Sequence, residues 1–218
     1  MAIPPYDLQI GTYTEDDHLI AATQEDREPR MRIYCLPRPV VVLGRGSKPE
    51  VELNQDACRA DRIPLLRRRG GGCAVLVDPG NVIVAVVLPV QGIGGNLRYF
   101  DQISRWLAAA LTCLGIEGVR REGSSDLVLG DRKVGGACIY RTKDLLYYSA
   151  TLLVNPQLEL MERYLRHPPR EPAYRQGRNH SQFIQPLCHL SDLTEADRGA
   201  DQLRPELHLS MLISSIAL

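Results

Sequence analysis

The sequence lacks an excess of charge of either sign, because 26 Lys and Arg residues balance 26 Asp and Glu residues. Proteins that bind nucleic acid or anionic membranes non-specifically usually carry a basic surface. The sequence also lacks a long apolar run: the longest, residues 82–90, falls far short of the roughly 20 residues that cross a bilayer. No basic segment precedes an apolar one at the N-terminus, as a secretory signal would require. We therefore expect neither a nucleic-acid partner nor a membrane partner.

Paired cysteines are also missing. The six cysteines are scattered and include no Cys-x-x-Cys pair, at Cys35, Cys58, Cys73, Cys113, Cys138 and Cys188. None of the five histidines pairs at a spacing typical of metal ligands. A disulfide framework and a structural metal are therefore not expected, and the reducing cytoplasm is the expected compartment.

The pattern of apolar residues predicts an α+β fold. Helices are expected over residues 16–25, 54–60, 101–114, 156–165 and 205–218, with Asn54 at an N-cap. Strands are expected over residues 31–35, 39–43, 64–69, 73–77, 82–88, 118–122, 126–129, 132–140 and 144–154. Residues 166–181 read as a loop rich in Pro, Arg and His. The hairpin order predicts a mostly antiparallel, mixed β-sheet flanked by helices. No segment resembles a linker, so residues 1–218 are expected to form a single domain.

Two segments carry residue types suited to anion chemistry. In the strand over residues 132–140, regular alternation places Lys133 on one face with Gly135, Ala137 and Ile139. An ammonium beside a nearly empty strand surface suits an anionic ligand or a developing oxyanion. Taken alone, the segment favours a solvated strand lysine beside a bulge.

The second segment, residues 67–72, reads Arg-Arg-Arg-Gly-Gly-Gly and lies between two expected strands. Glycines let backbone N–H groups approach a phosphate or carboxylate, and arginine adds charge-assisted hydrogen bonds. A plain glycine hairpin with solvated arginines is the alternative. The segment matches neither a Walker loop nor a dinucleotide-binding fingerprint, because no Gly-Lys-Ser/Thr and no helix follows.

Four stretches, in order, resemble motifs of the lipoate–protein ligase family. Residues 39–45 (PVVVLGR) resemble its Pro-x-Val-Val-Ile-Gly-Arg strand, and an acidic residue and an asparagine follow at Glu52 and Asn54. Residues 68–75 (RRGGGCAV) resemble Arg-Arg-x-Ser-Gly-Gly-Gly-x-Val. Residues 125–136 resemble Asn-Asp-Leu followed by Gly-Arg-Lys-Val-Ser-Gly, and residues 151–155 (TLLVN) resemble Gly-Thr-Leu-Leu-x-Asn. The resemblance covers about residues 15–190.

The resemblance implies an enzyme that uses ATP and Mg²⁺ to convert lipoate or octanoate into an acyl-adenylate. The acyl group then passes to a lysine of a lipoyl carrier protein or domain, either similar to the glycine-cleavage H protein or a lipoate-binding protein. Lys133 matches the catalytic lysine, and Asp126 matches a residue near the phosphate and metal. Tyr34 and Val75 are candidates for the acyl tunnel by position. The implied substrate- and adenylate-binding residues are Arg68, Arg69, Gly70, Gly71, Gly72, Cys73, Val75, Asn81, Asp126, Val134, Gly135, Gly136, Ala137 and Thr151.

The sequence departs from the family pattern at several places. Gly70 and Cys73 replace the usual serine and last glycine, Ser125 replaces the asparagine before Asp-Leu, and residues 148–150 (YSA) replace His-His-Gly. Many members also carry a further C-terminal domain, so the need for an accessory subunit stays open.

Other activities on the same fold are not excluded. Cysteine-dependent octanoyltransferases need a thiolate near the lysine. Cys188 loosely resembles the cysteine of their Pro-Cys-Gly motif, although His189 replaces the glycine. Cys73 and Cys138 are expected to be small apolar fillers. A biotin ligase and a non-catalytic module that binds a carrier or adenylate are further alternatives.

The basic loop over residues 166–180 is expected to dock an acidic carrier domain or to close over the nucleotide. It carries Arg166, His167, Arg170, Arg175, Arg178 and His180. A solvated proline-rich loop is the alternative.

Overall fold

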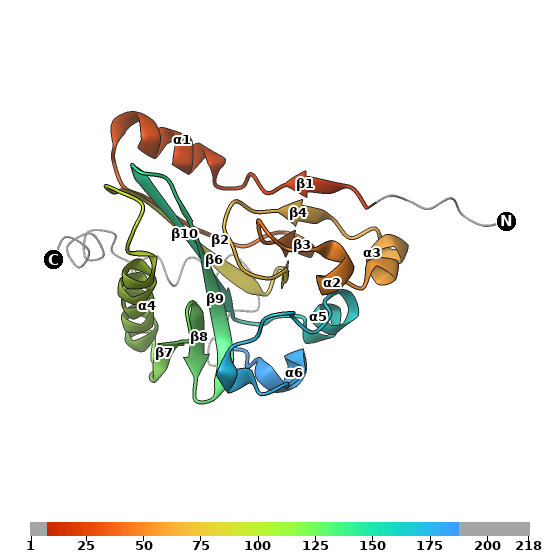
Figure 1. Cartoon of the computed structure of the whole chain (residues 1–218). Helices are drawn as coiled ribbons and strands as arrows, with labels where there is room; N and C mark the ends of the chain where they lie inside the picture. The colour runs from red at the N-terminus through yellow and green to blue at the C-terminus, as the bar shows by residue number, and fades with distance from the viewer. Residues whose placement is uncertain (1–7, 188–218) are drawn as a thin grey trace.

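The chain folds around two β-sheets, seen in the computed structural model, which describes residues 8–187. The larger sheet is antiparallel throughout and has the order β2-β6-β10-β9-β8-β7 (Figure 1). Its strands are β2 (Arg30–Tyr34), β6 (Asn81–Pro89), β10 (Leu145–Leu153), β9 (Arg132–Arg141), β8 (Asp126–Leu129) and β7 (Val119–Glu122). The expected helix over residues 205–218 and Cys188 lie outside the described residues.

The smaller sheet is mixed and has the order β1-β4-β3-β5. Its strands are β1 (Ile10–Thr12), β4 (Leu65–Arg67), β3 (Val40–Leu43) and β5 (Val75–Val77). β4 runs parallel to β1 and β3, whereas β5 runs antiparallel to β3. The predicted α+β class with a mostly antiparallel sheet is therefore confirmed, with the strands divided between two sheets.

Strand β6 is buried on both faces because helices or strands cover the large sheet on each side. Val84 and Val86 pack in the core beneath α4, whereas Ile83 and Ala85 pack in the core toward the small sheet. Such a strand reads as a continuous apolar run rather than as an alternating one, and the sequence has that run. All nine residues of β6 pair with β10, so these two strands form the centre of the sheet.

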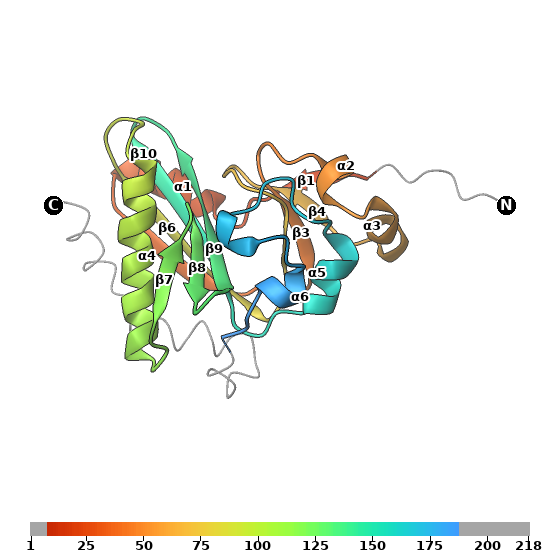
Figure 2. The same ribbon diagram turned by 60° about the horizontal axis from the view of Figure 1, so that its bottom comes forward.

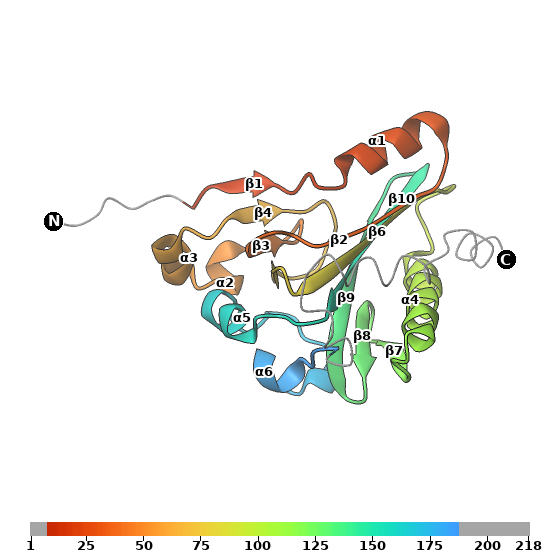
Figure 3. The same cartoon turned by 180° about the vertical axis from the view of Figure 1, so that it is seen from behind.

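Helix α4 (Asn96–Cys113) covers the outer face of the large sheet (Figures 1 and 3). Ile103, Leu107 and Leu111 recur at helical spacing and are fully buried. The helix begins five residues before the predicted start at 101, at an N-cap glycine, Gly95, with φ of 81°. Its first turn carries Asn96, Leu97 and Arg98, which break the apolar period and gave no signal.

The opposite side of the large sheet faces α1 (Asp17–Asp26) and the small sheet. Four short helices pack around the small sheet: α2 (Pro49–Glu52), α3 (Gln55–Asp61), α5 (Leu158–Tyr164) and α6 (His180–Phe183). After α5 the chain runs between the two sheets before it reaches α6 (Figure 2). This segment completes a cavity to which both sheets contribute.

The predicted loop over residues 166–181 is partly wrong. It contains a turn of 3₁₀ helix, η1 (Ala173–Arg175), and α6 begins inside it at His180. Asn179 caps α6 through a capping box, since its side chain accepts from Gln182 N while the Gln182 side chain accepts from Asn179 N. Elements this short carry too little apolar periodicity to be recognised. No helix among residues 8–187 is long and apolar enough to cross a membrane.

Candidate functional site

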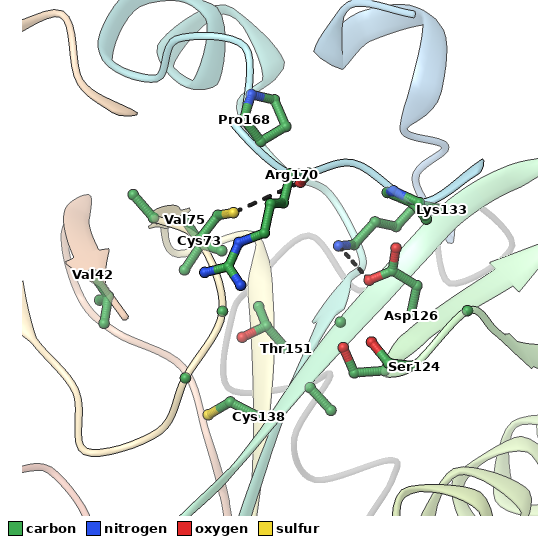
Figure 4. A pocket seen from close by; sticks show the side chains of 18 of the residues that line it. Val42, Cys73, Val75, Ser124, Asp126, Lys133, Cys138, Thr151, Pro168 and Arg170 are labelled. Carbon is green, nitrogen blue, oxygen red and sulfur yellow. Dashed lines mark hydrogen bonds and ion pairs between the residues drawn. The ribbon is translucent and has the colours of Figure 1, made fainter. Parts of the chain in front are cut away.

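Strands of both sheets and the segment before α6 enclose a cavity of about 760 Å³. This volume lies within the range of about 300–1,000 Å³ that small-molecule sites occupy. In Figure 4 Lys133 and Asp126 point toward one another on one side, while Val42, Val75 and Cys138 lie on the other. The apolar wall is formed mainly by Val42, Val75, Leu76, Val77, Ile83 and Leu153. The polar groups include Asp126, Lys133, Arg170, Glu171, Tyr174, Arg175 and His180. A ligand with an apolar body and an anionic head would match both parts.

Lys133 lies at a β-bulge between β8 and β9. Leu127 pairs with Gly135, whereas Val128 pairs with Lys133, so Val134 is an extra residue on β9. A bulge breaks the alternation of side chains between faces and re-aims the side chain beside it. The prediction that Lys133 shares a face with Gly135 is therefore wrong.

The cleared surface beside the ammonium belongs to Gly136. A Cβ atom on Gly136 would lie 3.0 Å from Lys133 Nζ and 3.6 Å from Asp126 Oδ1, so only glycine leaves the lysine in its place. Gly135 instead faces Leu127 and Leu152 of the core beneath α4. Val134 is fully buried in that core, and Ala137 and Ile139 pack against it. Thr151 pairs with Gly136 across the sheet and also lines the cavity.

Asp126 accepts hydrogen bonds on both of its oxygens. Lys133 Nζ donates to Oδ1 at 2.7 Å, and Tyr174 Oη donates to Oδ2 at 2.8 Å. Burial and the adjacent Asp126 raise the pKa of Tyr174, so its hydroxyl keeps its proton and stays a donor. The three side chains come from β8, β9 and η1, so a carboxylate, an ammonium and a phenol share one wall. The sequence gave no sign of Tyr174, because no motif covers η1.

The glycine loop is held by Arg68. Its guanidinium donates to the carbonyl oxygens of Val42 at 3.0 Å, Gly71 at 2.7 Å and Cys73 at 2.9 Å. Gly72 adopts φ of 91°, a conformation that residues with a side chain rarely adopt. Arg68 therefore shapes the loop from within, while Gly71, Gly72 and Cys73 line the cavity.

Two other members of the predicted loop lie outside the cavity lining. Arg69 donates to both oxygens of Asp17, at 3.1 and 3.0 Å, and its guanidinium lies over Tyr140. Gly70 packs on Cys138, because a Cβ atom there would lie 2.7 Å from the thiol sulfur. Both residues anchor the loop to its surroundings. A one-dimensional motif cannot separate such anchors from residues that face a ligand.

Glu52 fastens the same loop from the other side. This carboxylate is 6% exposed and accepts from Ser47 Oγ at 3.0 Å, Lys48 N at 3.1 Å and Ala74 N at 2.5 Å. The carbonyl oxygen of Gly72 lies 3.2 Å from Ser47 Oγ and is the alternative acceptor for the same hydroxyl hydrogen. The resemblance predicted an acidic residue at this position but gave it no role. Its contacts show that Glu52 connects α2 to the strand that follows the glycines.

Asn81 and Tyr34 do not line the cavity. Asn81 is fully buried at the start of β6, and its amide donates to the carbonyl of Asp78 at 3.2 Å. Tyr34 donates to buried Asp16 at 2.9 Å and does not line the cavity. The predicted residues that line it are Arg68, Gly71, Gly72, Cys73, Val75, Asp126, Lys133, Gly136, Ala137 and Thr151. Those that do not are Arg69, Gly70, Asn81, Val134 and Gly135.

The two cysteines of the cavity wall are poor nucleophiles. Burial raises the pKa of the Cys73 thiol and of the Cys138 thiol, which disfavours the thiolate. Burial and nearby Arg175 lower the pKa of His180 to about 4, so its imidazole is neutral at pH 7 and only weakly basic. Within residues 8–187, no group of three or more His, Cys, Asp or Glu side chains is arranged to hold a metal ion.

Comparison with known proteins gives one family. Residues 14–210 match the family described as lipoyl protein ligase A/B catalytic domain. A curated relative, the lipoate–protein ligase of Streptococcus pyogenes, is 34% identical over 133 residues, which are 61% of this chain and 38% of that protein. The chain spans 36% to 48% of the length of three curated relatives that it matches.

Solved structures share the fold. One is lipoate–protein ligase A bound with ATP, with a TM-score of 0.70 and 21% identity, covering 88% of this chain and 74% of that one. Another is the bipartite lipoate–protein ligase of Thermoplasma acidophilum, described with its E2 lipoyl domain. Its TM-score is 0.69 at 20% identity, covering 95% of this chain and 80% of that one.

Proposed function

Because the chain belongs to the lipoyl protein ligase A/B catalytic domain family, we propose that it is an ATP-dependent lipoate– or octanoate–protein ligase. The observation that carries the proposal is Lys133, an ammonium beside the cleared surface of Gly136 on the wall of a largely apolar cavity. The cavity suits an acyl chain whose carboxylate reaches Lys133. The relatives named lipoate–protein ligase and the similar fold bound with ATP support the same substrates.

In the first step a carboxylate oxygen of the acid attacks the α-phosphorus of ATP. The bond from that phosphorus to the bridging oxygen breaks, and pyrophosphate leaves with the electron pair. Lys133 exchanges its hydrogen bond with Asp126 for one with the carboxylate and the phosphate. A fixed cation at this place stabilises the charge that builds on the phosphoryl oxygens. The backbone of Gly71 and Gly72 approaches the same ligand without side chains in the way.

Magnesium enters this proposal as the ion that accompanies ATP. Mg²⁺ is commonly held by one or two carboxylates together with substrate phosphates and water. Asp126 is the carboxylate on the cavity wall beside Lys133, so we propose it as a ligand when the ion is bound. The ion would neutralise phosphate charge, while Tyr174 keeps Asp126 in place through its hydrogen bond.

In the second step a lysine amine of a carrier attacks the acyl carbonyl carbon. The amide bond forms, the bond to the phosphate oxygen breaks, AMP leaves and the amine gives up a proton. We propose a lipoyl carrier domain as the acceptor, either similar to the glycine-cleavage H protein or a lipoate-binding protein. The E2 lipoyl domain described with the Thermoplasma ligase supports the general class. The five cysteines among residues 8–187 are free thiols, which supports a reducing compartment such as the cytoplasm.

The decisive experiment is lipoate-dependent ATP–pyrophosphate exchange by the purified chain, with octanoate in parallel. A ligase exchanges label into ATP only when the acid is present. If exchange is absent but octanoyl carrier leaves an acyl adduct on Cys188, the chain is a transferase. If neither reaction occurs, the chain binds a carrier or adenylate without catalysis. Addition of a candidate accessory subunit then tests whether exchange needs a partner.

Replacing Gly136 by alanine should slow the reaction without unfolding the protein. The new Cβ atom would lie 3.0–3.1 Å from the end of the Lys133 side chain, which can swing away, so the stability cost is about 1 kcal/mol or less. A displacement of about 1 Å at a reacting group can cost about 100-fold in rate. Exchange kinetics and thermal unfolding of the same variant check both parts. Alanine at exposed Gly46, which does not line the cavity and where a Cβ meets no atom within 4 Å, is the matched control.

A further inference from the structure

Arg175 stands out among the cations of the cavity wall because it is buried without a full set of partners. The side chain is 5% exposed, and Nη2 has no hydrogen-bond partner among the described residues. Nε donates to the carbonyl of Arg178 at 2.9 Å and lies 3.7 Å from Glu171 Oε2. Buried guanidinium nitrogens in proteins are normally hydrogen-bonded, since an unpaired one costs desolvation energy.

The surroundings of Arg175 hold it in place rather than neutralise it. Its guanidinium stacks over the Phe183 ring at 4.7 Å, and burial lowers its pKa, with Glu171 and Asp126 opposing that shift. The preceding residue of the chain, Tyr174, donates to Asp126. Arg175 is therefore tied, through its neighbour, to the Asp126–Lys133 pair.

Arg178 offers an internal comparison, because it lies beside the same ring and is fully partnered. It donates to Asp131 Oδ2 at 2.9 Å and to the carbonyls of Asp131, Tyr174 and Arg175. It does not line the cavity, whereas Arg175 does. Both arginines belong to the basic loop over residues 166–180, which was expected to dock a carrier domain or to close over the nucleotide. Arg178 therefore holds the backbone of this segment in place, whereas Arg175 keeps one N–H donor group without a partner.

We propose that Arg175 binds the α-phosphate of ATP and of the acyl-adenylate through its free Nη2. This inference rests on the proposed function. The α-phosphate is the group that ATP and the acyl-adenylate share and that stays inside the site, because pyrophosphate must leave. A donor that is 5% exposed matches the inner phosphate better than the departing ones. Lys133 and Arg175 would then contact the reacting group from β9 and from η1.

Calorimetric titration of Arg175→Met with ATP, and separately with lipoate, tests the proposal. A lost hydrogen bond to a charged group should raise the Kd for ATP about 10- to 100-fold. The Kd for lipoate alone should stay within about twofold. Lipoyl transfer from preformed lipoyl-adenylate to the carrier should slow by a similar factor, because the phosphate is present in that step too. Arg175→Lys should restore part of the ATP affinity.

Arg163→Met is the control for a purely structural effect. It removes a guanidinium that is ion-paired with Asp61 and does not line the cavity, so it should lower the unfolding temperature while leaving the Kd for ATP unchanged. Unchanged ATP affinity in Arg175→Met overturns the inference, and so does an equal loss of lipoate affinity. A defect in exchange with normal transfer from lipoyl-adenylate also overturns it. In each case exchange by the unaltered chain stands as independent support for the ligase.

Discussion

Replacing Lys133 by methionine should reduce lipoate-dependent ATP–pyrophosphate exchange at least 100- to 1,000-fold, about 2.7–4 kcal/mol of transition-state stabilisation. Methionine keeps the length of the side chain but removes the ammonium that lies beside Gly136. Asp126 keeps its hydrogen bond from Tyr174, so the wall retains most of its shape. The loss should therefore appear in kcat for exchange, measured with the acid and ATP both saturating.

The matched control is Lys143→Met. Lys143 is 83% exposed and does not line the cavity, so its replacement should leave exchange unchanged. If Lys133→Met kept more than about a tenth of the exchange activity, the reaction would not depend on the Lys133 ammonium. That result would remove the main support for the proposed mechanism.

Replacing Glu52 by alanine should destabilise the protein by about 1–3 kcal/mol. The change leaves the part-buried hydrogen bonds from the N–H groups of Lys48 and Ala74 without their acceptor. For a chain of this size, 1 kcal/mol corresponds to a shift of about 2–4 °C in the unfolding midpoint. Urea unfolding and a thermal scan measure the effect directly.

Glu50 supplies the comparison for Glu52, because it lies in the same short helix and is exposed. Glu50→Ala should change stability by no more than about 0.5 kcal/mol. An equal effect of the two substitutions would mean that helix composition matters rather than the buried network. Glu52→Gln should fall between them, because an amide oxygen can accept from one N–H while the amide nitrogen faces another donor.

The sequence predicted most elements because their apolar residues follow a clear period. Ile103, Leu107 and Leu111 marked α4, and the run at residues 82–88 marked the central strand β6. The division of strands between two sheets was not predictable, because pairing depends on contacts far apart along the chain. Ile10 pairs with Leu65, for example, and Arg30 pairs with Val87. Short elements such as α2 and η1 carry no period at all.

For the site, ordered motifs placed Lys133, Asp126 and the glycine loop at one cavity, although each was ambiguous alone. The sequence could not show which way each side chain points. Because of the bulge at Val134, Gly136 rather than Gly135 lies beside the lysine. An alternating pattern of residues does not reveal one inserted residue. The sequence could not identify Tyr174 and Arg175 as site residues, because their position depends on how the segment after α5 crosses between the sheets.

The last described residues have a consequence for protein synthesis. Gln185 N donates to the carbonyl of Lys133 at 2.9 Å, and Leu187 N donates to the carbonyl of Leu153 at 2.8 Å. The backbone of Lys133 is thus joined to a segment about fifty positions later in the chain. While residues 173–187 are still inside the ribosome, the sheets can form but the cavity lacks Tyr174, Arg175 and α6. The nascent chain therefore acquires a complete site only after residues 173–187 have emerged.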